Sequence, residues 1–238
     1  MKALILAAGL GTRLRPLTDK TPKPLLMIGG KPLLTYHLES LAQAGCTEAL
    51  INSHYLAEQI NNFVANYSGP IKITVSYEQE LLGSAGTLSA NRDFFANQED
   101  FLVVYGDNLT NIDYNKLWCY HKAQATIATL ACYLESNPAE KGVVTYDLNN
   151  RLLSFIEKPG PGTPASYVNG GIYVFSQRIF DYLSKDYSES YDISRHLFSS
   201  QLITEEQIYI YKMTEFLLDI GNQENYLKAN QLCQTIFN

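Results

Sequence analysis

The chain has 238 residues, of which 46% are hydrophobic and 18% charged, so it is long and apolar enough to bury a substantial core. Its net charge of −6 argues against a broad nucleic-acid-binding surface, which would need a basic field. Its apolar runs are shorter than the ~18–20 residues that cross a bilayer, and the N-terminus lacks a signal-peptide pattern. We therefore expect neither a nucleic-acid partner nor a membrane partner.

The cysteines are scattered and form no recognisable pattern. They are Cys46, Cys119, Cys132 and Cys233. No two of them form a CxxC pair, and no histidine lies near them at metal-binding spacing. Such cysteines are typical of a reducing compartment, so we expect a cytoplasmic protein.

The N-terminal segment combines a strand with a glycine turn. Residues 3–8 form a short apolar run that ends in Gly9-Leu10-Gly11-Thr12-Arg13. Glycines let an anion approach the backbone N–H groups, and Arg13 and Lys23 add positive charge. The segment is not a dinucleotide fingerprint, because Leu14 replaces the third glycine, and it lacks the Gly-Lys-Ser/Thr of a P-loop. By itself it indicates either a triphosphate site or a tight strand-to-helix turn with surface charges.

The first half of the chain alternates between predicted strands and helices. We expect strands at residues 3–8, 47–51, 71–77 and 101–105, and helices from Pro32 to about Gly45, over 56–64 and opening within 78–88. This order predicts an α/β fold with a mostly parallel central sheet and helices on both faces. Ligand sites in such sheets lie beyond the carboxyl ends of the strands, where both the glycine turn and Asp107 fall.

The second half of the chain is richer in strands. We expect strands at residues 126–133, 142–146, 151–156, 168–175 and 207–211, and helices from about 178, from about 193 and after 222. Residues 157–162 form a rigid loop that contains two prolines and two glycines. We find no linker, so the sequence predicts a single domain over residues 1–238, with halves at about 1–124 and 125–238.

Six motifs occur in a fixed order along nearly the entire chain. They are GLGTRLRPLTDKTPKPLL at 9–26, LLGSAGTL at 81–88, YGDN at 105–108, FIEKP at 155–159, NGGIYVF at 169–175 and LLDIGNQENY at 217–226. Together they resemble the sugar-1-phosphate nucleotidylyltransferases. The resemblance implies a Rossmann-like, GT-A-like fold and an enzyme that joins a nucleoside triphosphate to a sugar 1-phosphate with release of pyrophosphate.

The resemblance also implies roles for particular residues. Asp107 and Asp219 would bind one Mg²⁺, although lone aspartates after strands are more often turn formers or helix caps. The implied catalytic residues are Arg13, Lys23, Asp107, Lys158 and Asp219. The implied nucleotide-binding residues are Leu6, Ala7, Ala8, Gly9, Gly11, Thr12, Arg13, Lys23, Gln79, Gly83, Ser84 and Asp107, in the first half of the chain.

The sugar-binding residues implied by the resemblance lie in the second half of the chain. Lys158 would hold the sugar phosphate and Glu157 the sugar hydroxyls, and the further contacts are Gly142, Asn169 and Gly170. Arg195 lies in a looser match, YDISRHLF, and is left open between a phosphate contact and an exposed helical arginine.

The choice of substrate depends on two segments. EQELLGSAGTL at 78–88 and KGVVTYD at 141–147 resemble mannose-type guanylyltransferases, which favours GTP with mannose 1-phosphate or a manno-heptose 1-phosphate, for cell-envelope polysaccharide. One alternative is a uridylyltransferase acting on an amino-sugar 1-phosphate such as N-acetylmuramate 1-phosphate. Another is a non-catalytic nucleotide-sugar-binding regulatory subunit, although such a subunit would be expected to lack some of the five catalytic residues. A homo-oligomer is left open, and because the sequence ends at Asn238 we expect no acyltransferase tail.

Replacing Asp107 or Lys158 tests the implied roles. Asp107→Ala and Lys158→Ala should each lower turnover by orders of magnitude and leave the fold intact, because neither residue needs to lie in the core. Steady-state pyrophosphate release measures the effect, and circular dichroism checks the fold. Release near the wild-type rate from either variant would contradict the role of that residue.

Overall fold

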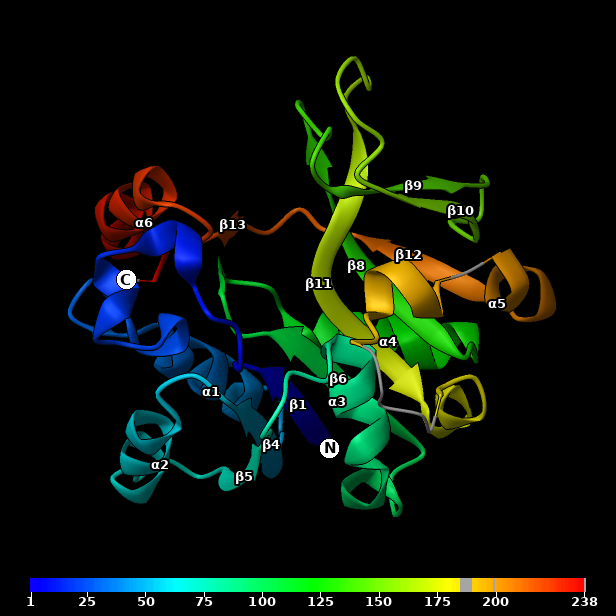
Figure 1. Ribbon diagram of the computed structural model, residues 1–238. Coiled ribbons are helices and arrows are strands. Elements are labelled where there is room, and N and C mark those ends of the chain that lie inside the picture. Colours follow the sequence, from blue (N-terminus) through cyan, green and yellow to red (C-terminus); the bar gives the residue numbers. More distant parts are fainter. Residues whose placement is uncertain (185–189, 199, 238) are drawn as a thin grey trace. The chain divides into compact units, whose positions relative to one another are not determined.

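The computed structural model describes residues 1–184, 190–198 and 200–237, which form two compact units (Figure 1). The first unit contains residues 1–81, 104–114 and those from 215 on, and the second contains residues 82–103 and 115–214. The chain thus crosses between the units several times, whereas the sequence suggested two consecutive halves. The prediction of one domain spanning the chain stays a prediction.

The first unit contains the parallel part of the sheet. Strands β1 (Lys2–Leu6), β4 (Glu48–Ser53) and β5 (Lys72–Tyr77) pair in parallel, with Ile5 opposite Ile51 and Ser53 opposite Tyr77. The end of β6 (Asp100–Tyr105) lies next to β1. The connecting helices are α1 (Leu33–Gln43) and α2 (Ala57–Ala65). The predicted α/β class with a mostly parallel central sheet is therefore confirmed.

Helix α1 ends where the sequence predicts. Gly45 has a φ of +81°, a left-handed conformation that glycine adopts without steric cost. Its N–H donates to the Ala42 carbonyl at 2.9 Å, and the N–H of Cys46 donates to the Leu41 carbonyl at 2.9 Å. These are the two hydrogen bonds of a Schellman motif, which satisfies the last carbonyls of a helix.

Short elements complete the first unit. β2 (Met27–Ile28) pairs with β3 (Lys31–Pro32), and β7 (Asn108–Thr110) pairs with β13 (Leu217–Asp219), both antiparallel. Helix α6 (Gln223–Ile236) lies beside the N-terminal segment (Figure 1), where the Tyr226 hydroxyl donates to the Met27 carbonyl at 3.0 Å. The sequence pattern predicted α6 but not these strands, because pairs of two or three residues are too short to show a period.

The second unit is built mainly from antiparallel strands. They are β8 (Ala128–Glu135), β9 (Gly142–Tyr146), β10 (Leu152–Glu157) and β11 (Ser166–Ser176), with β12 (Ile208–Lys212) parallel to β8. Helix α3 (Ser84–Ala90) begins within residues 78–88, the segment in which the sequence predicts that a helix opens. All five strands expected from the second half of the sequence are present.

Three helical segments in this part of the chain differ from the prediction. The helix expected from about residue 178 is a short 3₁₀ turn, η5 (Gln177–Asp181), and residues 185–189 lie outside the described residues. The helix expected from about 193 is a π turn, η6 (Ile193–Leu197), followed by α5 (Ser200–Glu205). Helix α4 (Tyr114–Gln124) was not predicted, since Leu117 is the one aliphatic residue at its buried positions among the described residues and the others carry Tyr114 and His121.

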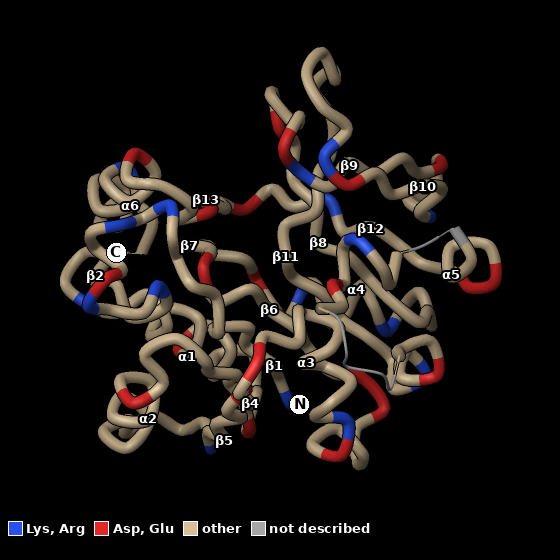
Figure 2. Tube along the Cα trace, in the orientation of Figure 1, with Lys and Arg blue, Asp and Glu red and all other residues tan. Residues whose placement is uncertain are grey.

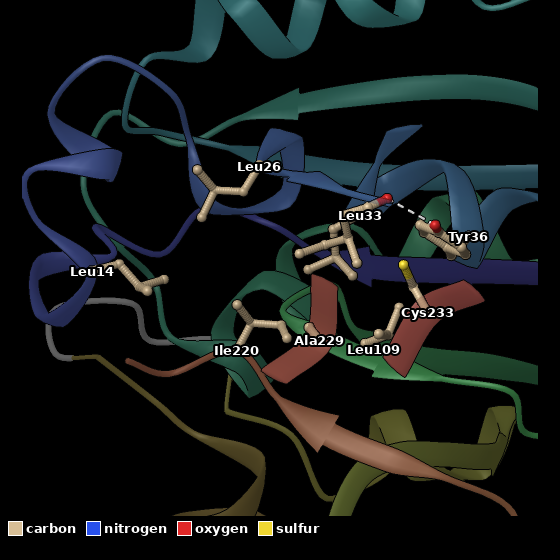
Figure 3. Close-up of a cluster of buried hydrophobic side chains, with 9 residues drawn as sticks. Leu14, Leu26, Leu33, Tyr36, Leu109, Ile220, Ala229 and Cys233 are labelled. Atoms are coloured by element: carbon tan, nitrogen blue, oxygen red, sulfur yellow. Dashed lines mark hydrogen bonds between the residues drawn. The ribbon is translucent and has the colours of Figure 1, made fainter. Parts of the chain in front are cut away.

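One apolar cluster anchors the segments that carry the predicted charged residues of the first unit (Figure 3). It consists of buried side chains from segments that lie far apart in the sequence: Leu14, Leu26, Ile28, Leu33, Tyr36, Leu109, Ile220, Ala229 and Cys233. Leu14 follows Arg13 directly, Leu109 lies two residues after Asp107, and Ile220 follows Asp219. Because these apolar residues are buried, the backbone beside them has a fixed position, and so have the Cα atoms of the adjacent charged residues.

Charged residues of both signs are interspersed along each unit (Figure 2). Within the part of the chain that the structure describes, no helix has the length and apolar character needed to span a membrane.

Shortening Ile220 tests the role of the cluster. Ile220→Ala leaves a cavity in the buried apolar cluster and should lower the free energy of unfolding by about 3 kcal/mol. Leu227→Ala in α6 is the matched control, because Leu227 is 61% exposed and its loss should cost less than about 0.5 kcal/mol. Urea unfolding measures both, and equal losses from the two variants would contradict the assigned role of the cluster.

Candidate active site

Two carboxylates and an ammonium meet in the first unit. Lys23 Nζ lies 2.6 Å from Asp107 Oδ2 and 3.7 Å from Asp219 Oδ1, and the Lys23 side chain is only 10% exposed. Lys23 opens the 3₁₀ turn η3 (Lys23–Leu25), Asp107 lies between β6 and β7, and Asp219 ends β13. The pairing of β13 with β7 places Asp219 opposite Asn108, which brings together two aspartates that are far apart in the sequence.

Backbone and side-chain contacts hold Asp219 beside Arg13. The Ile220 N–H donates to the Asp107 carbonyl at 3.0 Å, and Asn225 Nδ2 donates to the Asp219 carbonyl at 2.7 Å. A methyl group on Gly221 would lie 3.1 Å from Asp219 Oδ1 and 3.4 Å from Arg13 Nη2. The missing side chain of Gly221 therefore leaves the room that the aspartate and the arginine occupy.

Hydrogen bonds to the Gly11 carbonyl hold the end of the glycine turn. Gly11 has a φ of +64°, and its carbonyl accepts hydrogen bonds from the Thr18 hydroxyl at 2.7 Å and from the Leu14 N–H at 2.9 Å. Among the described residues, none accepts a hydrogen bond from the backbone N–H of Gly9, Leu10 or Gly11. A turn with such N–H groups beside a guanidinium has the donors that a phosphate needs.

The other predicted nucleotide contacts in the first unit surround this turn or follow β5. Leu6 ends β1, and its carbonyl accepts from the Gly106 N–H at 2.9 Å. Ala7 and Ala8 are buried, and Thr12 and Gln79 are exposed. The structure thus places these residues near the carboxyl ends of β1 and β5, the edge at which ligands of such sheets bind.

The carboxylates fit the chemistry of a magnesium site. Asp107 and Asp219 both reach the same cationic atom of Lys23, so both can approach one cation. Mg²⁺ is usually held by one or two protein carboxylates together with waters and substrate phosphates. Within the described ranges, no group of three or more His, Cys, Asp or Glu residues is placed to hold a metal ion, and the Mg²⁺ site stays a prediction.

A buried histidine lies within electrostatic range of Asp107. His37 of α1 is buried, and burial lowers its pKa to about 4 although the nearby Asp107 carboxylate acts in the opposite direction. The imidazole is therefore uncharged near pH 7 and adds no positive charge beside the carboxylate.

In the second unit, Glu157 lies over Gly142. The two residues are opposite one another in the β9–β10 pair, and a methyl group on Gly142 would come within 2.9 Å of Glu157 Oε2 and 2.5 Å of the Phe155 ring. Burial raises the pKa of Glu157, and the positive charges of Lys158 and Arg195 counteract that rise. The structure thus brings together Gly142 and Glu157, as the sequence suggested, and places Arg195 within electrostatic range of them.

Lys158 and Asn169 take unusual backbone positions. Lys158 has a φ of +50°, its side chain is exposed, and its Nζ lies 3.6 Å from Glu140 Oε2.

The pairing of β11 with β8 shifts register between Asn169 and Ile172, with Gly170 inside this bulge. Asn169 Nδ2 donates to the Tyr173 hydroxyl at 2.6 Å, and Asn169 Oδ1 accepts from the Gly171 N–H at 3.1 Å. Bulges of this kind re-aim side chains and are frequent beside active sites.

The predicted contacts Gly83 and Ser84 have partners within the protein. The Ser84 N–H donates to Asp192 Oδ1 at 3.2 Å, and the Ile193 N–H donates to the Ser84 hydroxyl at 2.8 Å. Gly83 has a φ of +77°, and a methyl group there would lie 2.7 Å from the Tyr191 backbone. The assignment of Gly83 and Ser84 to the nucleotide stays a prediction. The part played by Asp192 gave no signal in the sequence, because the contact depends on tertiary structure.

The predicted residues therefore form separate groups within the two units. Arg13, Lys23, Asp107 and Asp219 gather in the first unit, whereas Gly142, Glu157, Lys158 and Asn169 belong to the second. The group in the first unit contains cations that could bind phosphate and carboxylates that could bind a metal ion. The group in the second unit contains one carboxylate and one cation. Their catalytic and binding roles stay predictions.

Structural comparison identifies the fold. The crystal structure of HddC from Yersinia pseudotuberculosis is 24% identical, with a TM-score of 0.78 over 97% of this chain and 98% of that chain. A UDP-glucose pyrophosphorylase solved with UDP-glucose is 20% identical, with a TM-score of 0.85 over 98% of each chain. These likenesses support the Rossmann-like α/β fold.

Sequence comparison identifies the family. The mannose-1-phosphate guanylyltransferase catalytic subunit beta of Drosophila melanogaster is 33% identical over 95% of this chain and 61% of its own length. The mannose-1-phosphate guanyltransferase of Schizosaccharomyces pombe is 32% identical over 98% of this chain and 64% of its own length. The chain thus spans about three-fifths of the length of these relatives. The family model described as nucleotidyl transferase matches residues 2–235, and the chain belongs to the nucleotidyl transferase family.

Proposed function

We propose that the protein is a guanylyltransferase that joins GTP to mannose 1-phosphate or a manno-heptose 1-phosphate and releases pyrophosphate. The observation that carries this proposal is the approach of Asp107 and Asp219 to the same Lys23 ammonium in a nucleotidyl transferase chain. The choice of GTP and a manno-configured sugar is supported by the names of relatives at 32–33% identity.

The proposed reaction needs no general base. A phosphate oxygen of the sugar 1-phosphate attacks the α-phosphorus of GTP, a new P–O bond forms, and the bond to the β-phosphate breaks with pyrophosphate as the leaving group. The attacking phosphate is already ionised near neutral pH, so catalysis depends on positioning and on stabilising negative charge. This requirement matches a site of cations and carboxylates, with His37 kept neutral by burial.

The first unit would hold the triphosphate. Arg13 and the N–H groups of Gly9–Gly11, which have no acceptor among the residues that the structure describes, would bind the β- and γ-phosphates, and Lys23 would bind the α-phosphate. Asp107 and Asp219 would hold Mg²⁺, which when bound offsets the charge on the phosphate oxygens. Lys23 then balances the same carboxylates, which keeps them close to one another.

The second unit would bind the sugar phosphate. Glu157 would accept hydrogen bonds from sugar hydroxyls, and Gly142 leaves the space in which that carboxylate lies. Lys158 would bind the phosphate as an exposed cation, and Asn169 with Gly170 would contact the sugar from the β11 bulge. Arg195 lies near enough to influence Glu157 and is a further candidate for the phosphate.

We also propose a cytoplasmic location, where the nucleotide sugar would serve cell-envelope polysaccharide synthesis. This part of the proposal is supported by the four cysteines, all of which are free thiols in the structure.

An activity panel tests the proposed function. The protein with Mg²⁺ and each of GTP, UTP, CTP, ATP and dTTP is offered a set of sugar 1-phosphates, and pyrophosphate release is measured. We expect the highest kcat/KM with GTP and mannose 1-phosphate or a manno-heptose 1-phosphate, and loss of activity when EDTA removes the metal. A preference for UTP with N-acetylmuramate 1-phosphate would overturn the choice of substrates. Absence of release with every pair would favour a regulatory subunit.

Two glycine substitutions test whether the units bind different substrates. A methyl group on Gly9 meets no protein atom within 4 Å, so Gly9→Ala should preserve stability and raise only the KM for GTP, by about tenfold. Gly142→Ala would displace Glu157 and Phe155, so it should lower the Tm and raise only the KM for the sugar phosphate. Kinetics with each substrate varied in turn measure these effects. An increase in the same KM for both variants would contradict the assignment.

A further inference from the structure

The start of the glycine turn is tied to a side chain of the neighbouring strand. β1 and β4 pair in parallel as far as Ile5 and Ile51, after which β1 ends and β4 continues beside β5 to Ser53. At this point the Ala7 N–H donates to Asn52 Oδ1 at 2.6 Å. A side-chain amide therefore accepts the first N–H of the segment that leaves the sheet, where a backbone carbonyl would otherwise serve.

The orientation of the Asn52 amide is fixed by a buried carboxylate. Asn52 Nδ2 donates to Glu78 Oε1 at 2.8 Å, and Asn52 and Glu78 are only 3% and 4% exposed. A carboxylate can only accept hydrogen bonds, so the NH₂ group of Asn52 must face Glu78 and its oxygen must face Ala7. The amide thus has one orientation that satisfies both neighbours.

Glu78 is itself held by β4. Its backbone N–H donates to the Ser53 carbonyl at 2.8 Å, and its carbonyl accepts from His54 Nδ1 at 2.9 Å. The backbone of β4 at Ser53 thus holds Glu78, Glu78 orients the Asn52 side chain, and Asn52 holds the Ala7 N–H. A buried charged group is costly unless it is well hydrogen-bonded, and such groups can serve to specify one geometry.

We infer that Asn52, oriented by Glu78, is a positioning residue that sets the start of the glycine turn for triphosphate binding. The inference rests on the proposed function, in which the N–H groups of residues 9–11 bind phosphates. Because Ala7 is itself buried, losing the Asn52 oxygen would leave its N–H without an acceptor. The turn that begins two residues later would then lose its fixed position, and donors that are not preorganised bind an anion less well.

Exchanging the amide of Asn52 and the carboxylate of Glu78 between the two positions tests the inference. In Asn52→Asp an oxygen still faces Ala7, but the second oxygen meets the Glu78 carboxylate, so the pair repels and the KM for GTP should rise about tenfold. In the double variant Asn52→Asp/Glu78→Gln, the glutamine NH₂ donates to the new carboxylate. One negative charge and both hydrogen bonds are kept, so the KM should return to within about twofold of wild type.

A matched core variant separates positioning from general destabilisation. Ile60→Val in α2 removes one buried methyl group from the same unit and should lower the Tm without changing either KM. The KM for the sugar 1-phosphate should stay within about twofold in every variant, since Asn52 acts on the triphosphate turn. A KM for GTP that follows the loss in Tm equally in Asn52→Asp and Ile60→Val would overturn the inference.

The double variant Asn52→Asp/Glu78→Gln also tests the inference if Asn52→Asp alone does not fold. The double variant should fold and have a KM for GTP near that of wild type. If it does not fold, or if its KM for GTP stays high, the inference is wrong. Failure of the proposed function is recognised separately, because the wild-type protein would then release no pyrophosphate from GTP with any sugar 1-phosphate.

Discussion

The contact of Lys23 with two aspartates is the interaction on which the charged residues of the first unit depend. Asp107 and Asp219 carry like charges, and both side chains are partly removed from water, so a cation between them is required to keep them close. The ions alone would not fix this geometry. Leu14, Leu109 and Ile220 are buried in one apolar cluster, so that hydrophobic burial sets the backbone positions of the adjacent charged residues.

The glycine turn shows how a protein can keep backbone donors available for a ligand. The carbonyl of Gly11 is occupied by Thr18 and Leu14, and the N–H of Ala7 is occupied by Asn52. These contacts bind both ends of the turn and leave the N–H groups between them without partners among the described residues. Preorganisation of this kind reduces the entropy lost when a phosphate binds.

Two further glycines leave space for neighbouring carboxylates because they have no side chain. Gly221 leaves space beside the Asp219 carboxylate, and Gly142 leaves space for the Glu157 carboxylate. In both cases a methyl group would crowd an acidic side chain that the family resemblance assigns to a ligand. The same device therefore occurs in both units, in the proposed metal site of one and in the proposed sugar site of the other.

The sequence by itself determined the family, the α/β class and most long elements, since alternating patterns and motifs are local properties of the chain. It also gave the C-cap of α1 at Gly45 and the residue types of the proposed site. Only the tertiary structure brought Asp219 to Asp107 through the β13–β7 pair, because a three-residue strand has no period of its own. It alone also decided the contacts of Asn52 with Ala7 and Glu78, which depend on how β1, β4 and β5 align. Contacts between residues distant in sequence follow from packing, which no local pattern encodes.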